Sequence, residues 1–280
     1  QLFNDDVYSY VDDITIDKNR YIYKATFKDN SIIMISPEGD IITEWGFYGN
    51  NTEYVGNAAG LAVNNNTATI SLISDTYNKV LDYSVNGKFV QDWCAPRENP
   101  FITPANIAYS PDGRMVYISD KGNDEIPDSD CIWIFSNNNS NEKEFVRKFH
   151  GPPGDSVVDP QGLAVDSDGW VYVADTGKNR ILKFHPHYGD DEVEVIVSGT
   201  ILNAPSDVVL GNDGSIYVAH EGTDTENGCI RKFTPRGELL TTLYSGGEGI
   251  SEFVHPKGVA VSPGGLVYVA DWGNKVVRIL

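Results

Sequence analysis

A phrase of sequence that recurs at regular intervals constrains the fold of this chain more than any other feature. Residues 160–184 read PQGLAVDSDGWVYVADTGKNRILKF, and residues 256–280 read PKGVAVSPGGLVYVADWGNKVVRIL. Looser copies begin at Val11, Ala58, Pro104 and Pro205. Successive copies are 47, 46, 56, 45 and 51 residues apart, by subtraction between the aligned positions Ile14, Leu61, Ile107, Leu163, Val208 and Val259. A repeat of this period is typical of the four-stranded blade of a β-propeller.

Each copy contains a pattern of short strands. In the fourth copy, Leu163–Val165 ends in a polar turn closed by Gly169, and strands over Trp170–Ala174 and Arg180–Phe184 follow. A further strand comes after a Pro-x-Gly turn, as over Leu239–Tyr244. Proline presets the dihedral angle of such a turn and glycine takes its positive-φ position. No 3.6-residue period interrupts these strands, so the sequence predicts an all-β protein.

Six copies predict a single six-bladed β-propeller made of four-stranded antiparallel blades. We expect one domain over residues 1–280, with blades near 11–45, 58–93, 104–149, 160–198, 205–244 and 256–280. The last copy stops after its third strand. We expect residues 1–10, around Val7–Tyr10, to supply the missing outer strand and close the ring, because an open sheet edge invites aggregation.

The charge and hydropathy of the chain exclude two classes of partner. Lys and Arg number 21 against 40 Asp and Glu, which leaves a formal net charge of −19. Nucleic-acid binding requires a basic stripe that neutralises phosphate, and the sequence contains none. Apolar runs reach about five residues, as at Leu266–Ala270, whereas a membrane-spanning helix needs about twenty. We therefore expect neither nucleic-acid binding nor membrane insertion.

The repeated phrase P-x-G-[LIV]-A-V-D-x-x-G-x-[VI]-Y-V-A-D-x-x-N-[RK]-[IV] resembles the NHL repeat, and the resemblance extends over essentially the whole chain. It implies the six-bladed fold. It does not imply one activity, because NHL propellers serve in RNA binding, protein binding, adhesion and peptide-amide lyase chemistry. The amide lyases resemble this chain in fold but hold zinc among several histidines at the channel mouth, where this sequence offers only His255.

An aspartate closes the second strand of four copies, at Asp75, Asp120, Asp175 and Asp271, and the fifth copy has His220 in its place. A carboxylate at a strand end can accept hydrogen bonds from the backbone amides of a neighbouring loop. We interpret the recurring aspartate as structural, and His220 as a neutral replacement for it.

Alternate copies carry an oxygen-bearing side chain where the innermost strand begins, at the mouth of the central channel. These residues are Asp13, Asn106 and Asp207, and the other copies have glycine there. Three oxygen donors in a pseudo-threefold array suit a hard cation such as Ca²⁺. Alternatively, Lys257 supplies the positive charge in place of a metal, or the three side chains only form hydrogen bonds with channel water and neighbouring amides. Calcium-dependent gluconolactonase-like propellers, which the chain resembles in part at Asn106, use a channel Glu, Asn and Asp.

Two acidic loops are expected on the face that carries the channel mouth. Their side chains, with one aromatic neighbour, are Asp124, Glu125, Asp128, Asp130, Glu221, Asp224, Glu226 and Trp272. Neither loop has the spacing of an EF-hand. Aromatic side chains beside acidic ones favour a cationic peptide or a carbohydrate ligand.

Several features agree with an extracellular or cell-surface protein. The chain opens on Gln1, so either a signal peptide has been removed or a longer protein has been cut, and the sequence pI is about 4.5. Sequons for N-glycosylation begin at Asn50, Asn65 and Asn138, all in expected loops. The three cysteines, Cys94, Cys131 and Cys229, leave open whether any disulfide forms.

No catalytic residue emerges from the sequence, which lacks G-x-S-x-G and any histidine in a triad context. We therefore expect a secreted or cell-surface NHL propeller that binds a protein or carbohydrate, or assembles with itself, through its acidic and aromatic loop face. Ca²⁺ is the one cofactor that the sequence suggests. The alternative is a calcium-dependent hydrolase or lyase, lactonase-like or amide-lyase-like, that acts at the channel mouth.

Overall fold

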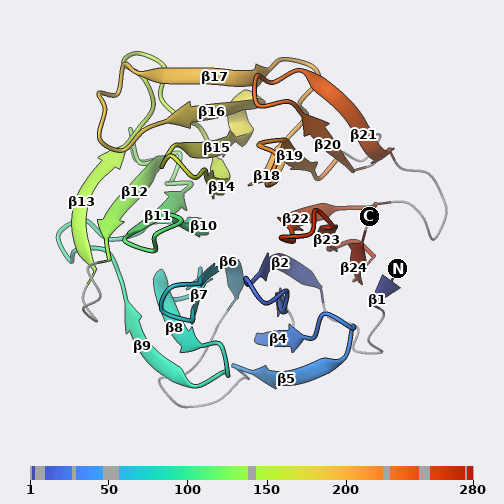
Figure 1. The fold of residues 1–280 in the computed structure, drawn as a ribbon. Coiled ribbons are helices and arrows are strands. Elements are labelled where there is room, and N and C mark those ends of the chain that lie inside the picture. The colour runs from blue at the N-terminus through green and yellow to red at the C-terminus, as the bar shows by residue number, and fades with distance from the viewer. Residues whose placement is uncertain are drawn as a thin grey trace.

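Six four-stranded antiparallel sheets surround a central channel in the computed structural model, which describes residues 2–3, 10–26, 30–46, 57–137, 143–222, 228–245, 253–274 and 276–279 (Figure 1). The predicted fold class is confirmed. Each of the first five sheets runs outward in chain order, from an innermost strand to an outermost one. The innermost strands pack against one another around the ring, from β2 and β6 to β22 and back to β2.

The strand bounds follow the repeat. Blade 1 contains β2 (Val11–Ile16), β3 (Ile22–Thr26), β4 (Ser31–Ile35) and β5 (Ile41–Trp45). Blade 2 contains β6 (Ala58–Asn64), β7 (Thr69–Ser74), β8 (Lys79–Ser84) and β9 (Phe89–Trp93). Blade 3 contains β10 (Pro104–Tyr109), β11 (Met115–Asp120), β12 (Cys131–Ser136) and β13 (Glu144–Phe149).

The second half of the ring has the same order. Blade 4 contains β14 (Pro160–Val165), β15 (Val171–Asp175), the 3₁₀ turn η1 (Thr176–Lys178), β16 (Arg180–Phe184) and β17 (Val193–Ser198). Blade 5 contains β18 (Pro205–Leu210), β19 (Ile216–His220), β20 (Cys229–Phe233) and β21 (Leu239–Ser245). Blade 6 contains β22 (Pro256–Val261), β23 (Val267–Asp271), β24 (Val276–Ile279) and β1 (Leu2–Phe3).

The N-terminal strand closes the ring, but at residues other than those expected. Leu2 pairs with Arg278 and Phe3 with Val277, so β1 is the outer strand of blade 6. Tyr10 lies elsewhere and stacks on the ring of Trp272 with centroids 4.4 Å apart. The reason is distance: β2 begins at Val11 beside the channel, and strands about 4.8 Å apart place the outer edge of a blade about 14 Å away. Residues 7–9 lie outside the described residues.

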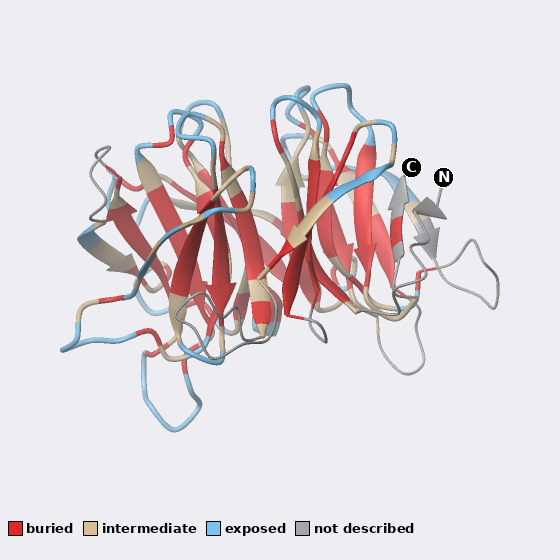
Figure 2. Cartoon of the chain, turned by 90° about the horizontal axis from the view of Figure 1, so that it is seen from below, coloured by how far each residue is buried: buried red, intermediate tan, exposed pale blue. Residues whose placement is uncertain are grey.

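The hydrophobic core lies between neighbouring blades. Tyr23 and Trp45 of blade 1 pack with Leu72 and Tyr83 of blade 2, and every other pair of neighbours shares a similar cluster. Figure 2 shows buried residues along the middle of the strands and exposed residues in the loops of both faces. Burial of each large apolar side chain contributes about 1.5 to 3 kcal/mol, so this packing holds the channel walls rigid. Among the described residues, no helix is long and apolar enough to cross a membrane.

Candidate functional site

The last residue of each second strand faces the first residue of the inner strand, and this position is held by Thr26, Ser74, Asp120, Asp175, His220 and Asp271. Asp120 accepts hydrogen bonds from the backbone nitrogens of Ile102 at 2.9 Å and Thr103 at 2.7 Å. Asp271 accepts from the nitrogens of Val254 and His255. The structural reading is confirmed for these aspartates, although most of the amides lie in the loop before the inner strand.

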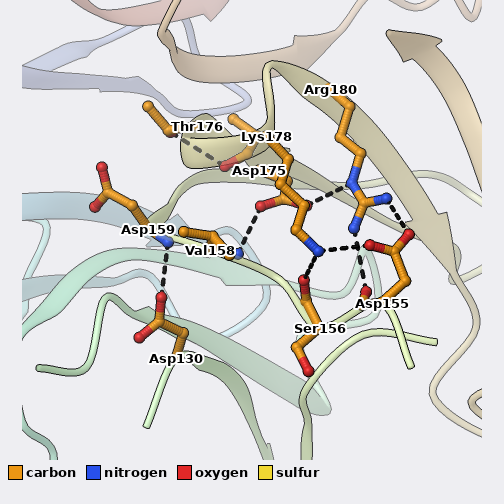
Figure 3. A network of polar contacts seen from close by, with 10 residues as sticks. Asp130, Asp155, Ser156, Val158, Asp159, Asp175, Thr176, Lys178 and Arg180 are labelled. Atoms are coloured by element: carbon orange, nitrogen blue, oxygen red, sulfur yellow. Dashed lines mark hydrogen bonds and ion pairs between the residues drawn. The ribbon is translucent and has the colours of Figure 1, made fainter. Parts of the chain in front are cut away.

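Asp175 also accepts hydrogen bonds from a neighbouring loop, and in addition it forms an ion pair with Arg180. Its Oδ1 accepts from the backbone nitrogen of Val158 at 2.7 Å, and its Oδ2 accepts from Nε of Arg180 at 2.6 Å (Figure 3). Arg180 also pairs with Asp155, to which Nζ of Lys178 donates at 2.5 Å. The hydrogen bonds from these two cations lower the pKa of Asp155 to about 2. The network ties the loop before β14 to the start of β16.

Two copies depart from the aspartate pattern. In blade 2, Ser74 takes the facing position, so the alignment of Asp75 with the other aspartates is wrong by one residue. Asp75 instead lines the channel mouth. In blade 5, Nδ1 of His220 lies 3.3 Å from the backbone nitrogen and 3.2 Å from the carbonyl oxygen of Asn203. Burial, assisted by the charge of Arg231, lowers the pKa of His220 to about 4, so the ring is neutral as expected.

The ring of Asp13, Asn106 and Asp207 connects neighbouring blades. Asp13 accepts from the nitrogen of Ile14 in its own strand and from that of Leu61 in the next blade, both at 2.7 Å. Asp207 repeats the arrangement with Val208 and, in blade 6, with Val259, both at 2.8 Å. In blade 3 the hydroxyl of Ser119 crosses to the next blade instead, donating to the carbonyl oxygen of Gln161 at 2.6 Å.

The alternating glycines make room for these side chains. A Cβ atom on Gly162 would lie 2.3 Å from Oδ1 of Asp207, and one on Gly258 would lie 2.6 Å from Oδ1 of Asp13. A Cβ on Gly60 would lie 2.6 Å from the Cα of Asn106. No side chain fits at such distances, so each glycine is dictated by the oxygen-bearing residue of the following blade.

Two cavities meet at this ring. The mouth cavity has a volume of about 170 Å³, and its polar lining includes Asp12, Asp13, Asp75, Asn106, Lys121, Gln161, Ser206, Glu221 and Lys257. A second cavity of about 330 Å³ continues down the channel between the apolar walls of the inner strands. Asp13 and Asn106 line both cavities, so the ring forms the boundary between them.

Among the described residues, no Lys, Arg or His forms an ion pair with the two buried aspartates of the ring. Burial raises the pKa of Asp13 to about 7, against the lowering effect of its backbone hydrogen bonds. Burial and the charge of Asp13 raise the pKa of Asp207 well above its ordinary value. Lys257, the alternative counter-charge, instead places Nζ 3.3 Å from Oδ1 of Asp12. The carboxyl of Asp13 lies beside Gly258, and that of Asp207 accepts a hydrogen bond from the nitrogen of Val259, so both are next to the same stretch of β22. A cation there would compensate the negative charge of both.

The chemistry of the ring fits a hard divalent cation. Its donors are two carboxyls and one amide oxygen, with neither thiolate nor imidazole among them. A group of three or more His, Cys, Asp or Glu side chains arranged for a metal is absent from the part of the chain that the structure describes. Asp13, Asn106 and Asp207 are therefore the residues that would hold Ca²⁺.

The acidic loop residues do not converge on a site. Asp124, Glu125 and Asp128 are exposed on the loop between β11 and β12. Oδ2 of Asp130 turns inward and accepts from the backbone nitrogen of Asp159 at 2.8 Å. Three further sequence-predicted residues divide between the mouth and the undescribed part: Glu221 lines the mouth cavity, whereas Asp224 and Glu226 lie outside the described residues.

Trp272 is engaged by its neighbours rather than free for a ligand. Its ring stacks on Tyr10, lies 6.0 Å from the ring of His255, and carries Nζ of Lys257 at 5.1 Å. It therefore holds Lys257 in place beside Asp12.

Sequence reasoning placed Glu221 on this face and named Lys257 as a counter-charge, but it gave Asp12 no role and counted Asp75 among the structural aspartates. Asp12 and Lys257 immediately follow the leading position of their copies, and Asp75 and Glu221 follow the ends of their second strands. Asp12 is 8% exposed, and its Oδ2 has no hydrogen-bond partner in the part of the chain that the structure describes. Burial raises the pKa of Asp12 to about 6, Lys257 opposes the shift, and the charges of Asp75 and Glu221 add to it.

Comparison with known families gives two matches. Residues 83–211 match the SMP-30/Gluconolactonase/LRE-like region, and residues 253–280 match the NHL repeat. The first match includes Asn106 and Asp207 of the ring.

Comparison with curated proteins finds relatives of several kinds. The chain is 24% identical over 211 residues to SUPPRESSOR OF QUENCHING 1 of Arabidopsis thaliana, covering 64% of this chain and 19% of that protein. It is 27% identical over 198 residues to the peptidylglycine alpha-amidating monooxygenase of Rattus norvegicus, covering 62% and 18%. It is 30% identical over 151 residues to the 6-phosphogluconolactonase of Formosa agariphila, covering 52% and 38%. The chain thus spans less than half the length of each of these relatives.

Solved structures share the fold. A catalytically inactive virginiamycin B lyase from Staphylococcus aureus with quinupristin superposes with a TM-score of 0.66 at 16% identity, over 100% of this chain and 87% of that one. A gluconolactonase from Xanthomonas campestris gives a TM-score of 0.68 at 11% identity, over 97% and 86%. A nidogen/laminin complex gives 0.64 at 16% identity, over 86% and 82%.

Proposed function

Because this chain is an NHL-repeat, gluconolactonase-like six-bladed β-propeller, we propose that it is an enzyme, a hydrolase or lyase that acts on a small molecule at the mouth of its channel. The observation that carries the proposal is the pairing of Asp12 with Lys257 on the wall of the mouth cavity, beside the buried carboxyls of the ring. A base and a cation held together over a cavity are the groups that acyl transfer and elimination both need.

Asp12 is placed to act as the base. Its Oδ1 is held by Lys257 at 3.3 Å, while its buried Oδ2 has no hydrogen-bond partner among the described residues and so keeps its lone pairs for a proton. In ester hydrolysis Asp12 takes a proton from water as the water oxygen bonds to the carbonyl carbon, and returns that proton to the departing alkoxide. In an elimination it takes a proton from the carbon beside the carbonyl, the C–O bond at the next carbon breaks as the double bond forms, and the departing oxygen receives the proton from Asp12. The ammonium of Lys257 stabilises the negative charge that develops in either case.

Asp13, Asn106 and Asp207 would hold a divalent cation where the mouth cavity meets the second cavity. Such a cation supplies Lewis-acid polarisation of a carbonyl group. The backbone hydrogen bonds of the two aspartates fix their carboxyls in place, so this part of the site is organised before a substrate arrives.

The test is hydrolysis of glucono-δ-lactone and γ-butyrolactone, followed by proton release with and without added CaCl₂. We expect turnover above the uncatalysed rate, and a loss of about a hundredfold or more in kcat for Asp12→Asn. Asp168→Asn is the matched control, because Asp168 is an exposed aspartate at the turn between β14 and β15, away from the mouth. An absence of turnover, or equal activity in the two variants, would contradict the proposal.

A second candidate is the binding or assembly module that the sequence favoured. The observation in its support is the loop between β11 and β12, where Asp124, Glu125 and Asp128 are all exposed and free to meet a cationic partner. Capture of a partner from the native source, lost when these three residues are changed to Asn or Gln and retained in Asp12→Asn, would favour this function over catalysis.

Secretion and glycosylation are a separate proposal. Asn65 lies in the turn between β6 and β7, and its Oδ1 accepts a hydrogen bond from the backbone nitrogen of Lys18 at 2.8 Å. Asn50 and Asn138 lie outside the described residues. Native eukaryotic material is expected to carry sugar on at least one of the three, and an intact mass equal to the bare 30.8 kDa chain would contradict this.

A further inference from the structure

The mouth cavity carries more negative than positive charge. Four carboxylate residues line it, Asp12, Asp13, Asp75 and Glu221, against two lysines, Lys121 and Lys257. Lys257 is already paired with Asp12. Lys121 acts on the other side of the mouth, where burial raises the pKa of Asp159 and the charge of Lys121 opposes that shift. The remaining charge of the cavity is therefore negative.

Asp75 and Glu221 are the unpaired part of this charge. Each directly follows the end of a second strand, in blades 2 and 5, and each is partly exposed in the cavity wall. Asp75 accepts a hydrogen bond from the hydroxyl of Thr76 at 3.2 Å. Within the described ranges, neither carboxylate has a Lys, Arg or His nitrogen within ion-pair distance. Both act electrostatically on Asp12, which places the three acidic groups around one space.

A second, independent feature of the cavity is an acceptor without a donor. Asp12 is more than nine-tenths buried and lines the cavity. Lys257 occupies its Oδ1, and no residue that the structure describes donates to its Oδ2. A buried acceptor left without a donor costs about 1 to 3 kcal/mol, which a bound donor would recover. Oδ2 of Asp12 is thus an acceptor without a donor among the described residues.

We propose that the mouth cavity recognises the ammonium group of a small amine-bearing molecule through Asp12, Asp75 and Glu221. This inference rests on the proposed function in that it takes the mouth cavity as the binding site, and it assigns a ligand class: amine-bearing rather than phosphorylated or carboxylated. An amine bound there occupies Oδ2 of Asp12, so it excludes the catalytic use of Asp12 while it is bound. An ammonium group has three donors and no acceptor, which matches three acidic acceptors. A cavity of about 150 Å³ holds benzene, so about 170 Å³ suits a six-membered ring that bears the amine.

The same charge works against anionic ligands. A phosphate or carboxylate in this cavity would meet Asp75 and Glu221, and Lys257 is held by Asp12 and Trp272, which leaves Lys121 of the lining to receive it. Like charges brought together in a partly dehydrated site repel each other and lose hydration as well. The cavity therefore selects against acids as well as for amines.

Calorimetric titration with three ring compounds of one size tests the inference: cyclohexylamine, cyclohexanol and cyclohexanecarboxylate, each in EDTA and in CaCl₂. We expect cyclohexylamine to bind at least about tenfold more tightly than cyclohexanol, and the carboxylate to bind most weakly. Glu221→Gln and Asp75→Asn should each weaken cyclohexylamine several-fold and leave cyclohexanol unchanged. Glu238→Gln, which removes an exposed carboxylate from the turn between β20 and β21, is the matched control and should change nothing.

The outcomes separate this inference from the proposed function. Equal or tighter binding of cyclohexanol or of the carboxylate would overturn the amine assignment, while lactone turnover that depends on Asp12 would still support the enzyme. A loss of amine affinity in Glu238→Gln equal to that in Glu221→Gln would also overturn it, because the effect would then be one of total charge. Binding of none of the three compounds would overturn it whether or not turnover is observed.

Discussion

Oδ2 of Asp13 lies 2.7 Å from the backbone nitrogen of Leu61, across the boundary between the first and second blades. Asp207 makes the corresponding bond to Val259 at 2.8 Å, between the fifth and sixth blades. The carboxyls that would hold a cation are therefore also the groups that tie the innermost strands together. Any ligand of this ring acts on the spacing of the blades, and any change of the spacing acts on the ring.

This double role makes the alternating glycines sensitive positions. Gly162→Ala would bring a Cβ atom to 2.3 Å from Oδ1 of Asp207, and Gly258→Ala to 2.6 Å from Oδ1 of Asp13. We expect each to lower the free energy of unfolding by about 1 to 3 kcal/mol, the usual cost of overpacking. Gly264→Ala is the control, since its nearest neighbour would be Oγ of Ser262 at 3.8 Å. Chemical denaturation measures all three, and equal stability of Gly162→Ala and Gly264→Ala would contradict the account.

Ring closure through β1 gives a second prediction. Alternate residues of an antiparallel strand bond to the partner strand, so replacing both Leu2 and Phe3 by proline must remove the backbone bonds that β1 donates to β24. At about 1 kcal/mol for a hydrogen bond, the melting temperature should fall by about 2 to 4 °C. Replacing both residues by alanine keeps the backbone donors and isolates the contribution of the side chains. An unchanged melting curve in the proline variant would show that β1 does not hold the ring closed.

The sequence predicted the architecture because each copy of the repeat corresponds to one blade. A strand, a polar turn and a second strand recur in every copy, and they need only local turn chemistry and alternating burial to form. The pseudo-threefold ring was predictable for the same reason, because Asp13, Asn106 and Asp207 keep one aligned position. Their bonds to the next blade were not, since those bonds depend on how two copies pack.

The place of Asp75 in the cavity lining was not predicted, because it depends on strand register. Asp75 looks like the aspartates that end β11, β15 and β23, yet Ser74 pairs with Ala58 and moves Asp75 into the mouth. One residue of slip sends a side chain to the other face of a strand, and the repeat pattern alone does not report such a slip. The closing strand was placed too late for another reason: Tyr10 directly precedes β2 at the channel and stacks on Trp272, too far from the outer edge of blade 6 to belong to β1.

His220 gives a prediction about acid stability. Its pKa is about 4 in the folded protein, below the ordinary 6.5, so the folded state favours the neutral ring. The stability it contributes is complete above pH 6.5 and is lost as the pH falls through 4, by about 3 kcal/mol at most. His220→Asp restores the residue found at Asp120, Asp175 and Asp271, and an aspartate would also attract Arg231. We expect this variant to lose less stability than the parent between pH 6.5 and 4, as measured by denaturation at each pH.

A control for that prediction is His187→Asn, because His187 is an exposed histidine at the turn before β17. It should leave the acid dependence unchanged. Equal acid sensitivity of His220→Asp and the parent would assign the loss to other groups.

The cation at the ring gives the last prediction. If Asp13, Asn106 and Asp207 bind Ca²⁺, EDTA should lower the melting temperature and added Ca²⁺ should restore it, because a ligand that binds only the folded state stabilises it by about 2.7 kcal/mol at a concentration a hundred times its Kd. Asp207→Ala should abolish this response. Lys257→Met should retain it, since Lys257 is bonded to Asp12 rather than to the ring. A flat response to EDTA, with Lys257→Met as the destabilising change, would instead mean that the ring needs no metal and that Lys257 alone balances the charge of the mouth.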